Sequence, residues 1–236
     1  MKIGIMGLAG AGKDTFAEEL LKHLPGARID RFASPLKKAA EYVFGPYFDD
    51  RVVKEKRIPV TASTYDRMIE GAMQVCNELG FTEQEEEAAS LYFFESALGE
   101  KDPDLYLSCE DLPRISPREY QQLLGTEVIR KVRETAFSDR IKNMQGMVLL
   151  TDCRFSTEVQ AVDYVLLVVR ESVYGARPEH SSEHLSWDLT DLFYSGDWNS
   201  FPHTLQVIRN EGTKYDLDKE ALYTSKRIIR ILNTIN

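Results

Sequence analysis

Glycine, lysine and hydroxyl residues near the start of the chain have the types and the spacing that bind a polyphosphate. The segment from Gly7 to Thr15 reads Gly-Leu-Ala-Gly-Ala-Gly-Lys-Asp-Thr and follows the apolar stretch Ile3–Met6. Glycines let the backbone curl so that consecutive N–H groups point at phosphate oxygens, and the lysine adds a mobile positive charge. The pattern predicts a strand, a phosphate-binding loop and a helix, and therefore a protein that uses a nucleoside triphosphate.

Asp14 stands where such loops usually carry the hydroxyl residue that binds magnesium, and Thr15 supplies the hydroxyl one position later. Two roles are open for Asp14. It either orders magnesium-bound water or caps the helix that begins beside Lys13. We expect Mg²⁺ as the cofactor, held by Asp14 and Thr15 directly or through water.

More charged residues follow other apolar runs. The runs 147–151, 164–169 and 205–208 are typical of buried parallel strands, and 27–33 predicts a further short strand. Residues that follow parallel strands gather at one edge of the sheet. The groups expected at this edge are the loop 7–15, Arg31, Asp152, Arg154, Arg170 and the turn 210–213. Such a cationic edge suits phosphoryl transfer between two anionic substrates.

The catalytic candidates are Lys13, Asp152, Arg154 and Arg177. Arg154 is the best placed arginine, with a surface ion pair to Glu158 as the alternative. Asp152 either orients hydrated magnesium, fixes Arg154 or caps the next helix. Arg177 lies in a turn-rich segment, 171–187, which acts as a lid over the phosphates or is an ordinary solvated loop.

Strands that alternate with helices predict a three-layer α/β fold of the P-loop NTPase type, with a central, mainly parallel five-stranded sheet. Helices are expected at 15–24, 34–44 and 217–235, and a capping box at Ser116 and Glu119 begins another. Between 46 and 117 the sequence is charged and weakly periodic, which indicates a mostly helical insertion. We expect this insertion to bind the substrate. We expect one domain over 1–236.

Glu127 and Arg130 lie three residues apart on the helix that follows Ser116, so an ion pair within the helix explains them without a substrate. The interruption at Gly125 and Thr126 favours a functional role. A glycine in mid-helix costs about 1 kcal/mol relative to alanine and often marks a close approach by another group.

Composition and residue spacing argue against several classes of protein and of site. The formal charge of −9 disfavours binding along a nucleic-acid backbone, and no apolar run is long enough to span a membrane. Cys76, Cys109 and Cys153 are too widely spaced for a disulfide framework, and His180 and His184 lack the neighbours of a metal site. The chain enters a strand without a leader sequence, so we expect a cytoplasmic protein, either a monomer or a homodimer.

In their order and spacing, these motifs resemble the deoxynucleoside monophosphate kinases of tailed bacteriophages, which are P-loop nucleoside monophosphate kinases. The resemblance covers most of the chain outside the insertion. Its motifs are Gly7-x4-Gly12-Lys13-Asp14-Thr15, Phe32-Ala-Ser-Pro-Leu-Lys37, Leu124-Gly-Thr126-Glu127-x2-Arg130, Asp152-x-Arg154-Phe155-x2-Glu158, His180-x-Ser182-Glu183 and Asn210-x-Gly212-Thr213.

The resemblance implies transfer of the γ-phosphoryl group of ATP to a deoxynucleoside monophosphate, with magnesium, for the supply of DNA precursors. The ATP-binding residues would be Gly10, Ala11, Gly12, Lys13, Asp14, Thr15, Asn210 and Gly212, with the turn 210–213 at the adenine. The residues around the monophosphate would be Arg31, Lys37, Gln122, Thr126, Glu127, Arg130, Arg154 and Glu158.

Two rival functions remain. Another small-molecule P-loop kinase, similar to dephospho-coenzyme A kinase, shares the glycine-rich loop and a segment like Ala33-Ser-Pro-Leu-Lys37. A regulatory module that binds ATP or GTP without catalysis is the second. The chain lacks a guanine-reading Asn-Lys-x-Asp motif, and arginines follow several of its expected strands, which favours an enzyme.

Overall fold

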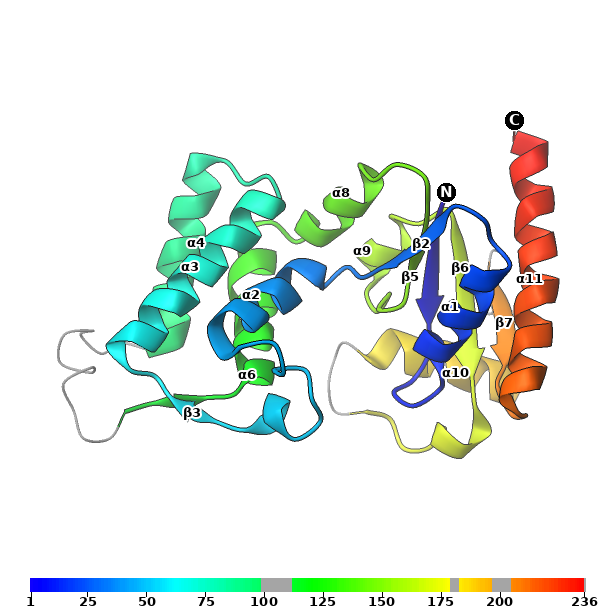
Figure 1. The fold of residues 1–236 in the computed structure, drawn as a ribbon, viewed down its shortest axis with the longest axis horizontal. Helices are drawn as coiled ribbons and strands as arrows, with labels where there is room; N and C mark the ends of the chain where they lie inside the picture. Colours follow the sequence, from blue (N-terminus) through cyan, green and yellow to red (C-terminus); the bar gives the residue numbers. More distant parts are fainter. Residues whose placement is uncertain (99–111, 179–182, 197–204, 236) are drawn as a thin grey trace. The chain divides into compact units, whose positions relative to one another are not determined.

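The computed structural model describes residues 1–98, 112–178, 183–196 and 205–235, and the chain divides into two compact units (Figure 1). The sheet unit comprises 1–32 and 141–236, and the helical unit comprises 33–140. Each unit is described by itself.

The sheet unit is an α/β structure built on a five-stranded sheet in which every strand pair is parallel. Its strands are β1 (Lys2–Met6), β2 (Ala27–Asp30), β5 (Met147–Leu150), β6 (Tyr164–Val169) and β7 (Leu205–Arg209). Its helices are α1 (Lys13–Lys22), α9 (Ser156–Val159), the 3-10 helix η3 (Glu171–Val173), α10 (His184–Ser195) and α11 (Lys214–Ile235). The apolar runs of the sequence therefore form the parallel sheet that they predict.

Helices lie on both faces of this sheet. On one face, Ile3 and Ile5 of β1 are fully buried in one cluster with Phe16 of α1 and Ala221 of α11. Side chains alternate across a strand, so Gly4 faces the other way. A Cβ atom at Gly4 would lie 3.2 Å from Cys153 Sγ, in the segment that leads into α9, and α10 packs against β6. The close approach of Cys153 explains a glycine at this position.

The strand order is β2-β5-β1-β6-β7, which places β1 in the centre. From β1 the chain first builds β2 and β5 on one side and then crosses to β6 and β7 on the other. In open parallel sheets the crevice beyond the carboxyl end of a strand at such a switch point is the usual ligand site. The topology therefore places the glycine-rich segment after β1 where a ligand is expected.

The helical unit contains the expected insertion, 46–117, and extends beyond it on both sides, because α2 packs against α3 and α6. It is mainly helical, and an antiparallel pair of two-residue strands joins its parts. Its elements are α2 (Ser34–Phe44), the 3-10 helix η1 (Val53–Glu55), β3 (Ile58–Pro59), α3 (Ala62–Glu78), α4 (Glu83–Leu98), β4 (Arg114–Ile115), α6 (Pro117–Gln122), the π-helix η2 (Leu123–Ile129), α7 (Arg130–Val132) and α8 (Ala136–Lys142), whose last two residues belong to the sheet unit.

Tyr120 is the centre of the helical core. Its side chain is fully buried, and its hydroxyl donates a hydrogen bond to Met68 O at 2.8 Å. Phe44 and Phe93 contact its ring edge-on. The helix that carries Tyr120 begins with the predicted capping box, in which Ser116 and Glu119 each accept a hydrogen bond from the other's backbone N–H.

The glycine at 125 lies in the π-helical segment η2. A Cβ atom there would lie 2.8 Å from Leu36 Cδ1, so the group that approaches closely is a core side chain of α2. The sequence predicted a close approach at this position, and packing accounts for it without a substrate.

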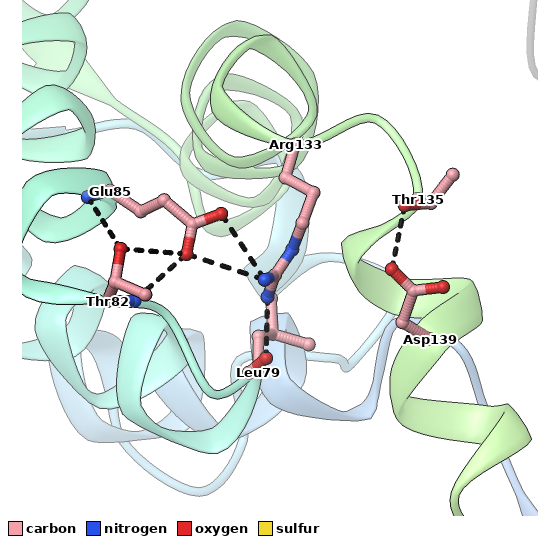
Figure 2. A network of polar contacts seen from close by, with 6 residues as sticks. All are labelled: Leu79, Thr82, Glu85, Arg133, Thr135 and Asp139. Carbon is pink, nitrogen blue, oxygen red and sulfur yellow. Dashed lines mark hydrogen bonds and ion pairs between the residues drawn. The ribbon is translucent and has the colours of Figure 1, made fainter.

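An arginine in the helical unit joins three helices (Figure 2). Arg133 follows α7 and donates to Leu79 O, at the end of α3, at 2.7 Å. Its guanidinium lies 3.3 Å from Glu85 of α4 and stacks over the ring of Phe81. Glu85 also accepts the N–H of Thr82, at the start of α4. Through these contacts Arg133 connects α7 with α3 and α4 within the helical unit.

Candidate functional site

The segment between β1 and α1 has backbone angles that glycine alone adopts readily. Gly7, Gly10 and Gly12 have φ of +143°, +79° and +93°. Two of them also lack space for a side chain. A Cβ atom at Gly7 would lie 2.3 Å from Val168 O, and one at Gly12 would lie 2.3 Å from Asn210 Nδ2. The sequence therefore shapes a tight turn here that other residue types would open.

The amino terminus of α1 carries no side-chain cap. Gly12 is the N-cap residue and makes no capping hydrogen bond, whereas Thr61 caps α3 and Ser116 caps α6. The first N–H groups of a helix have no partner within the helix, and the helix dipole makes this end positive. An anion is a fitting partner for these groups.

Lys13 folds back over the loop. Its ammonium group donates to Gly7 O at 2.8 Å and to Leu8 O at 2.9 Å. Burial, together with the positive charge of Arg154, lowers the pKa of Lys13 to about 8, against the opposing effect of carboxylates such as Glu183. Two cations held near each other favour an anion between them.

A cavity of about 420 Å³ opens over this loop, within the size range of ligand pockets. Seven of the eight residues expected to bind ATP line it, and the eighth, Ala11, is fully buried in the loop. The lining residues are Gly10, Gly12, Lys13, Asp14, Thr15, Arg170, Asn210, Gly212, Lys214 and Leu217. The loop before α1 and the turn before α11, which are about 200 residues apart in the sequence, thus line the same cavity.

No family model and no curated protein matches this chain.

Asp14 makes an ion pair with Arg31, at 2.9 Å between Oδ1 and Nη2. Partial burial raises the pKa of Asp14, but its hydrogen bonds outweigh this effect, and the net pKa lies below the ordinary value. Asp14 is therefore an ionised carboxylate at the rim of the cavity. Arg31, expected at the monophosphate, is tied to α1 in this structure.

The segment after β5 is held by two carboxylates. Asp152 Oδ1 accepts the N–H of Phe32 at 2.7 Å, which joins the ends of β2 and β5. Glu158 is 2 % exposed, and its Oε2 accepts the N–H groups of Arg154 and Phe155 at 2.8 and 3.2 Å. Glu158 therefore shapes the backbone on which the exposed Arg154 side chain stands.

Residues 171–178 of the expected lid are fixed to α10, and residues 184–187 of the same predicted segment begin α10. Tyr174 donates to Asp191 at 2.5 Å, Trp187 donates to Gly175 O at 3.0 Å, and Arg177 lies 3.1 Å from Asp188. The Arg177 guanidinium also lies 5.8 Å from the centre of the Trp187 ring. Arg177 is therefore an exposed residue that pairs with α10, and it is not among the described residues that line the cavity.

The turn after β7 lines the cavity and is hydrogen-bonded to the loop between β1 and α1. Asn210 Nδ2 donates to Ala11 O at 2.8 Å, and the N–H of Asn210 donates to Val169 O at 2.9 Å. Gly212 leaves room for the Asp216 carboxylate, since a Cβ at position 212 would lie 2.6 Å from Asp216 Oδ2. Asp216 in turn accepts hydrogen bonds from Thr213 at the start of α11.

The remaining candidates belong to the helical unit. Lys37 pairs with Asp49 at 2.5 Å. Arg130 donates to Glu134 O at 3.4 Å, and its guanidinium lies 5.0 Å from the centre of the Phe137 ring. Three further candidates are exposed on this unit: Gln122, Thr126 and Glu127.

Lys214 and Leu217 line the cavity but were not among the predicted site residues. A lysine in the first turn of a 22-residue helix opposes the helix dipole, and this signal in the sequence points to an anion nearby. One such anion is Glu19 of α1, which is 2 % exposed and lies 3.3 Å from Lys214 Nζ.

The sequence analysis also made predictions about metal sites, cysteines and membrane-spanning segments, and the structure bears on these only where it describes the residues. Within them, no group of three or more His, Cys, Asp or Glu could hold a metal ion, and no helix is long and apolar enough to cross a membrane. Cys76 and Cys153 are free and buried. His184 contacts Pro178 O at 3.0 Å, while His180 and Cys109 lie outside the described residues.

Proposed function

We propose that this protein is an ATP-dependent kinase that phosphorylates a deoxynucleoside monophosphate. The observation that carries the proposal is the cavity at the carboxyl end of the central strand, in which the glycine-rich loop, Lys13, Thr15 and the turn after β7 meet. A loop of this kind offers N–H groups and a cation to phosphate oxygens.

Charge supports a polyphosphate as the ligand. The chain as a whole is acidic, yet the described residues that line the cavity include three cations, Lys13, Arg170 and Lys214, and one carboxylate, that of Asp14. Arg154 adds its charge beside Lys13. Phosphoryl transfer needs cations that neutralise charge on the transferred group and little covalent chemistry from the protein. Lys13 and Arg154 are the residues proposed for that task.

A magnesium ion would enter with the nucleotide. Mg²⁺ keeps several waters and needs only one or two protein oxygens besides the phosphates. The donor set fits this requirement, since the Thr15 hydroxyl and the ionised Asp14 carboxylate line the same cavity as Lys13. When bound, the metal would neutralise charge on the β- and γ-phosphates.

The identity of the acceptor rests on the resemblance to phage deoxynucleoside monophosphate kinases. Arg154 and Arg31 would hold its phosphate from the sheet unit, with Glu158 positioning Arg154 through the backbone. The resemblance also implies acceptor-binding residues that belong to the helical unit: Lys37, Gln122, Thr126, Glu127 and Arg130.

Formation of ADP from Mg-ATP tests the proposal, measured with a panel of deoxynucleoside monophosphates, ribonucleoside monophosphates and dephospho-coenzyme A. We expect deoxynucleoside monophosphates to accelerate ADP formation most. A folded protein that binds ATP but is not accelerated by any of them contradicts the proposal. Acceleration by dephospho-coenzyme A alone would identify a different kinase.

The affinity for Mg-ATP should fall as the pH rises above about 8. The pKa of Lys13 is about 8 in the ligand-free protein, and a bound polyanion raises it. Binding therefore takes up a proton above pH 8, and the affinity falls by up to about tenfold per pH unit there. Calorimetry in buffers of different ionisation enthalpy measures both effects.

The matched control for this titration is Lys13→Arg, because a guanidinium group keeps its charge throughout the range. The inflection near pH 8 should be absent in this variant. An identical pH profile in Lys13→Arg and the unaltered protein would assign the proton uptake to another group.

A further inference from the structure

We infer that Asn210 is a positioning residue that fixes one peptide of the β1–α1 loop and thereby directs the Gly12 N–H for phosphate binding. The inference rests on the proposed function and goes beyond it. It also assigns Asn210 a role other than the adenine contact that the resemblance implies.

The first step is the hydrogen bond from the Asn210 side chain to Ala11 O, at 2.8 Å. Ala11 O can only accept, so the side chain must present its NH₂ group. The contact is close because Gly12 has no side chain, and a Cβ there would lie 2.3 Å from Asn210 Nδ2. Asn210 and the Ala11–Gly12 peptide therefore fit closely together, although Asn210 and Ala11 are 199 positions apart in the sequence.

The second step is the geometry of the peptide between Ala11 and Gly12. It is trans, so its C=O and N–H point in opposite directions. Holding Ala11 O at Asn210 therefore fixes the direction of the Gly12 N–H. Gly12 is the uncapped N-cap residue of α1 and has φ of +93°, and a glycine at this position reorients easily unless something holds it.

The third step is the rigidity of the support. The Asn210 N–H is bonded to Val169 O at the end of β6. Next to it, Glu211 Oε1 accepts the N–H of Glu171 at 2.7 Å and the Tyr194 hydroxyl at 3.0 Å. The turn is thus anchored to β6, η3 and α10, and it can hold a loop peptide in place.

The variants Asn210→Asp and Asn210→Leu test this role, because both keep about the size of the side chain and remove the donor to Ala11 O. Asn210→Leu adds no charge to the cavity lining, so a loss of affinity for both ligands in this variant cannot come from repulsion by a new carboxylate. Asn233→Asp is the matched control, since Asn233 is exposed on α11 and the change in charge is the same. The ligands are Mg-ATP and inorganic tripolyphosphate, with dissociation constants measured by calorimetry for each.

A positioning role predicts that Asn210→Asp and Asn210→Leu each weaken both ligands by about 10- to 100-fold, as is usual when a supporting contact is lost. The control should change both by no more than about twofold. A direct contact with the base predicts weaker ATP binding with unchanged tripolyphosphate binding, and that result would overturn the inference.

Amide hydrogen exchange in the ligand-free protein provides a second readout. Asn210→Asp should speed exchange at Ala11 and Phe16, whose N–H groups donate to Leu8 O and Gly12 O, and leave the strands β1 and β6 unchanged, which a general loss of stability would not do. Unchanged exchange at both amides also overturns the inference. If the unaltered protein binds neither ligand, the proposed function fails, and hydrogen exchange alone then decides the role of Asn210.

Discussion

Replacing Lys13 with alanine is expected to lower the rate of phosphoryl transfer by about a thousandfold or more while the fold persists. The ammonium group is the charge nearest the loop carbonyls, at 2.8 and 2.9 Å, and it would lie against the transferred phosphate. Electrostatic groups aimed at a transition state are worth about 10²–10³ in rate each, and the charge on a phosphoryl group makes it especially sensitive to them.

The fold should survive this change because Lys13 lines a cavity and is not one of the buried apolar residues of the core. Steady-state kinetics and a thermal melt measure the two effects separately. Lys226→Ala is a suitable control, since Lys226 is exposed on α11 and outside the cavity lining. Turnover of Lys13→Ala within about threefold of the unaltered protein would remove Lys13 from the catalytic machinery.

Replacing Gly7 with alanine is expected to cost about 3 kcal/mol of folding free energy. Two effects add: a φ of +143°, which L-residues rarely adopt, and a Cβ only 2.3 Å from Val168 O. Since Val168 belongs to β6, relief of the clash would separate the loop from the sheet or disturb the pairing of β1 with β6. Urea denaturation measures the loss.

The control Gly26→Ala separates these two effects. Gly26 also has positive φ, +79°, but a Cβ there meets nothing within 4 Å. The Gly26→Ala variant should lose about 1 kcal/mol of folding free energy, from the unfavourable backbone conformation alone. If Gly7→Ala is no more destabilising than Gly26→Ala, the close contact with Val168 O is not a constraint on this loop.

Local patterns in the sequence predict the strands of the parallel sheet and several of the helices. The continuous apolar runs become β5 and β6, and the Ser116 capping box begins α6. The two-residue strands β3 and β4 were not predicted, because alternation cannot be detected over so few residues. Secondary structure was thus predictable wherever several consecutive residues followed a helix or strand pattern.

The site was predictable in its residue types and less so in its contacts. The loop glycines and Lys13 carry a local pattern, and the structure brings seven of the eight expected ATP-binding residues to one cavity. Contacts between distant segments leave no such pattern. The pairing of Asp14 with Arg31 and the support of Ala11 by Asn210 depend on how strands far apart in the chain align.

The division of the chain into two units has a consequence for the order of events during synthesis. The helical unit is one continuous segment, 33–140, whereas β1 pairs with β5 and β6, whose residues follow only at 147–150 and 164–169. Long-range pairing is slow, and domains form as their residues emerge. We expect the helical unit to fold on the ribosome while β1 is still unpaired, before β5 and β6 have been synthesised.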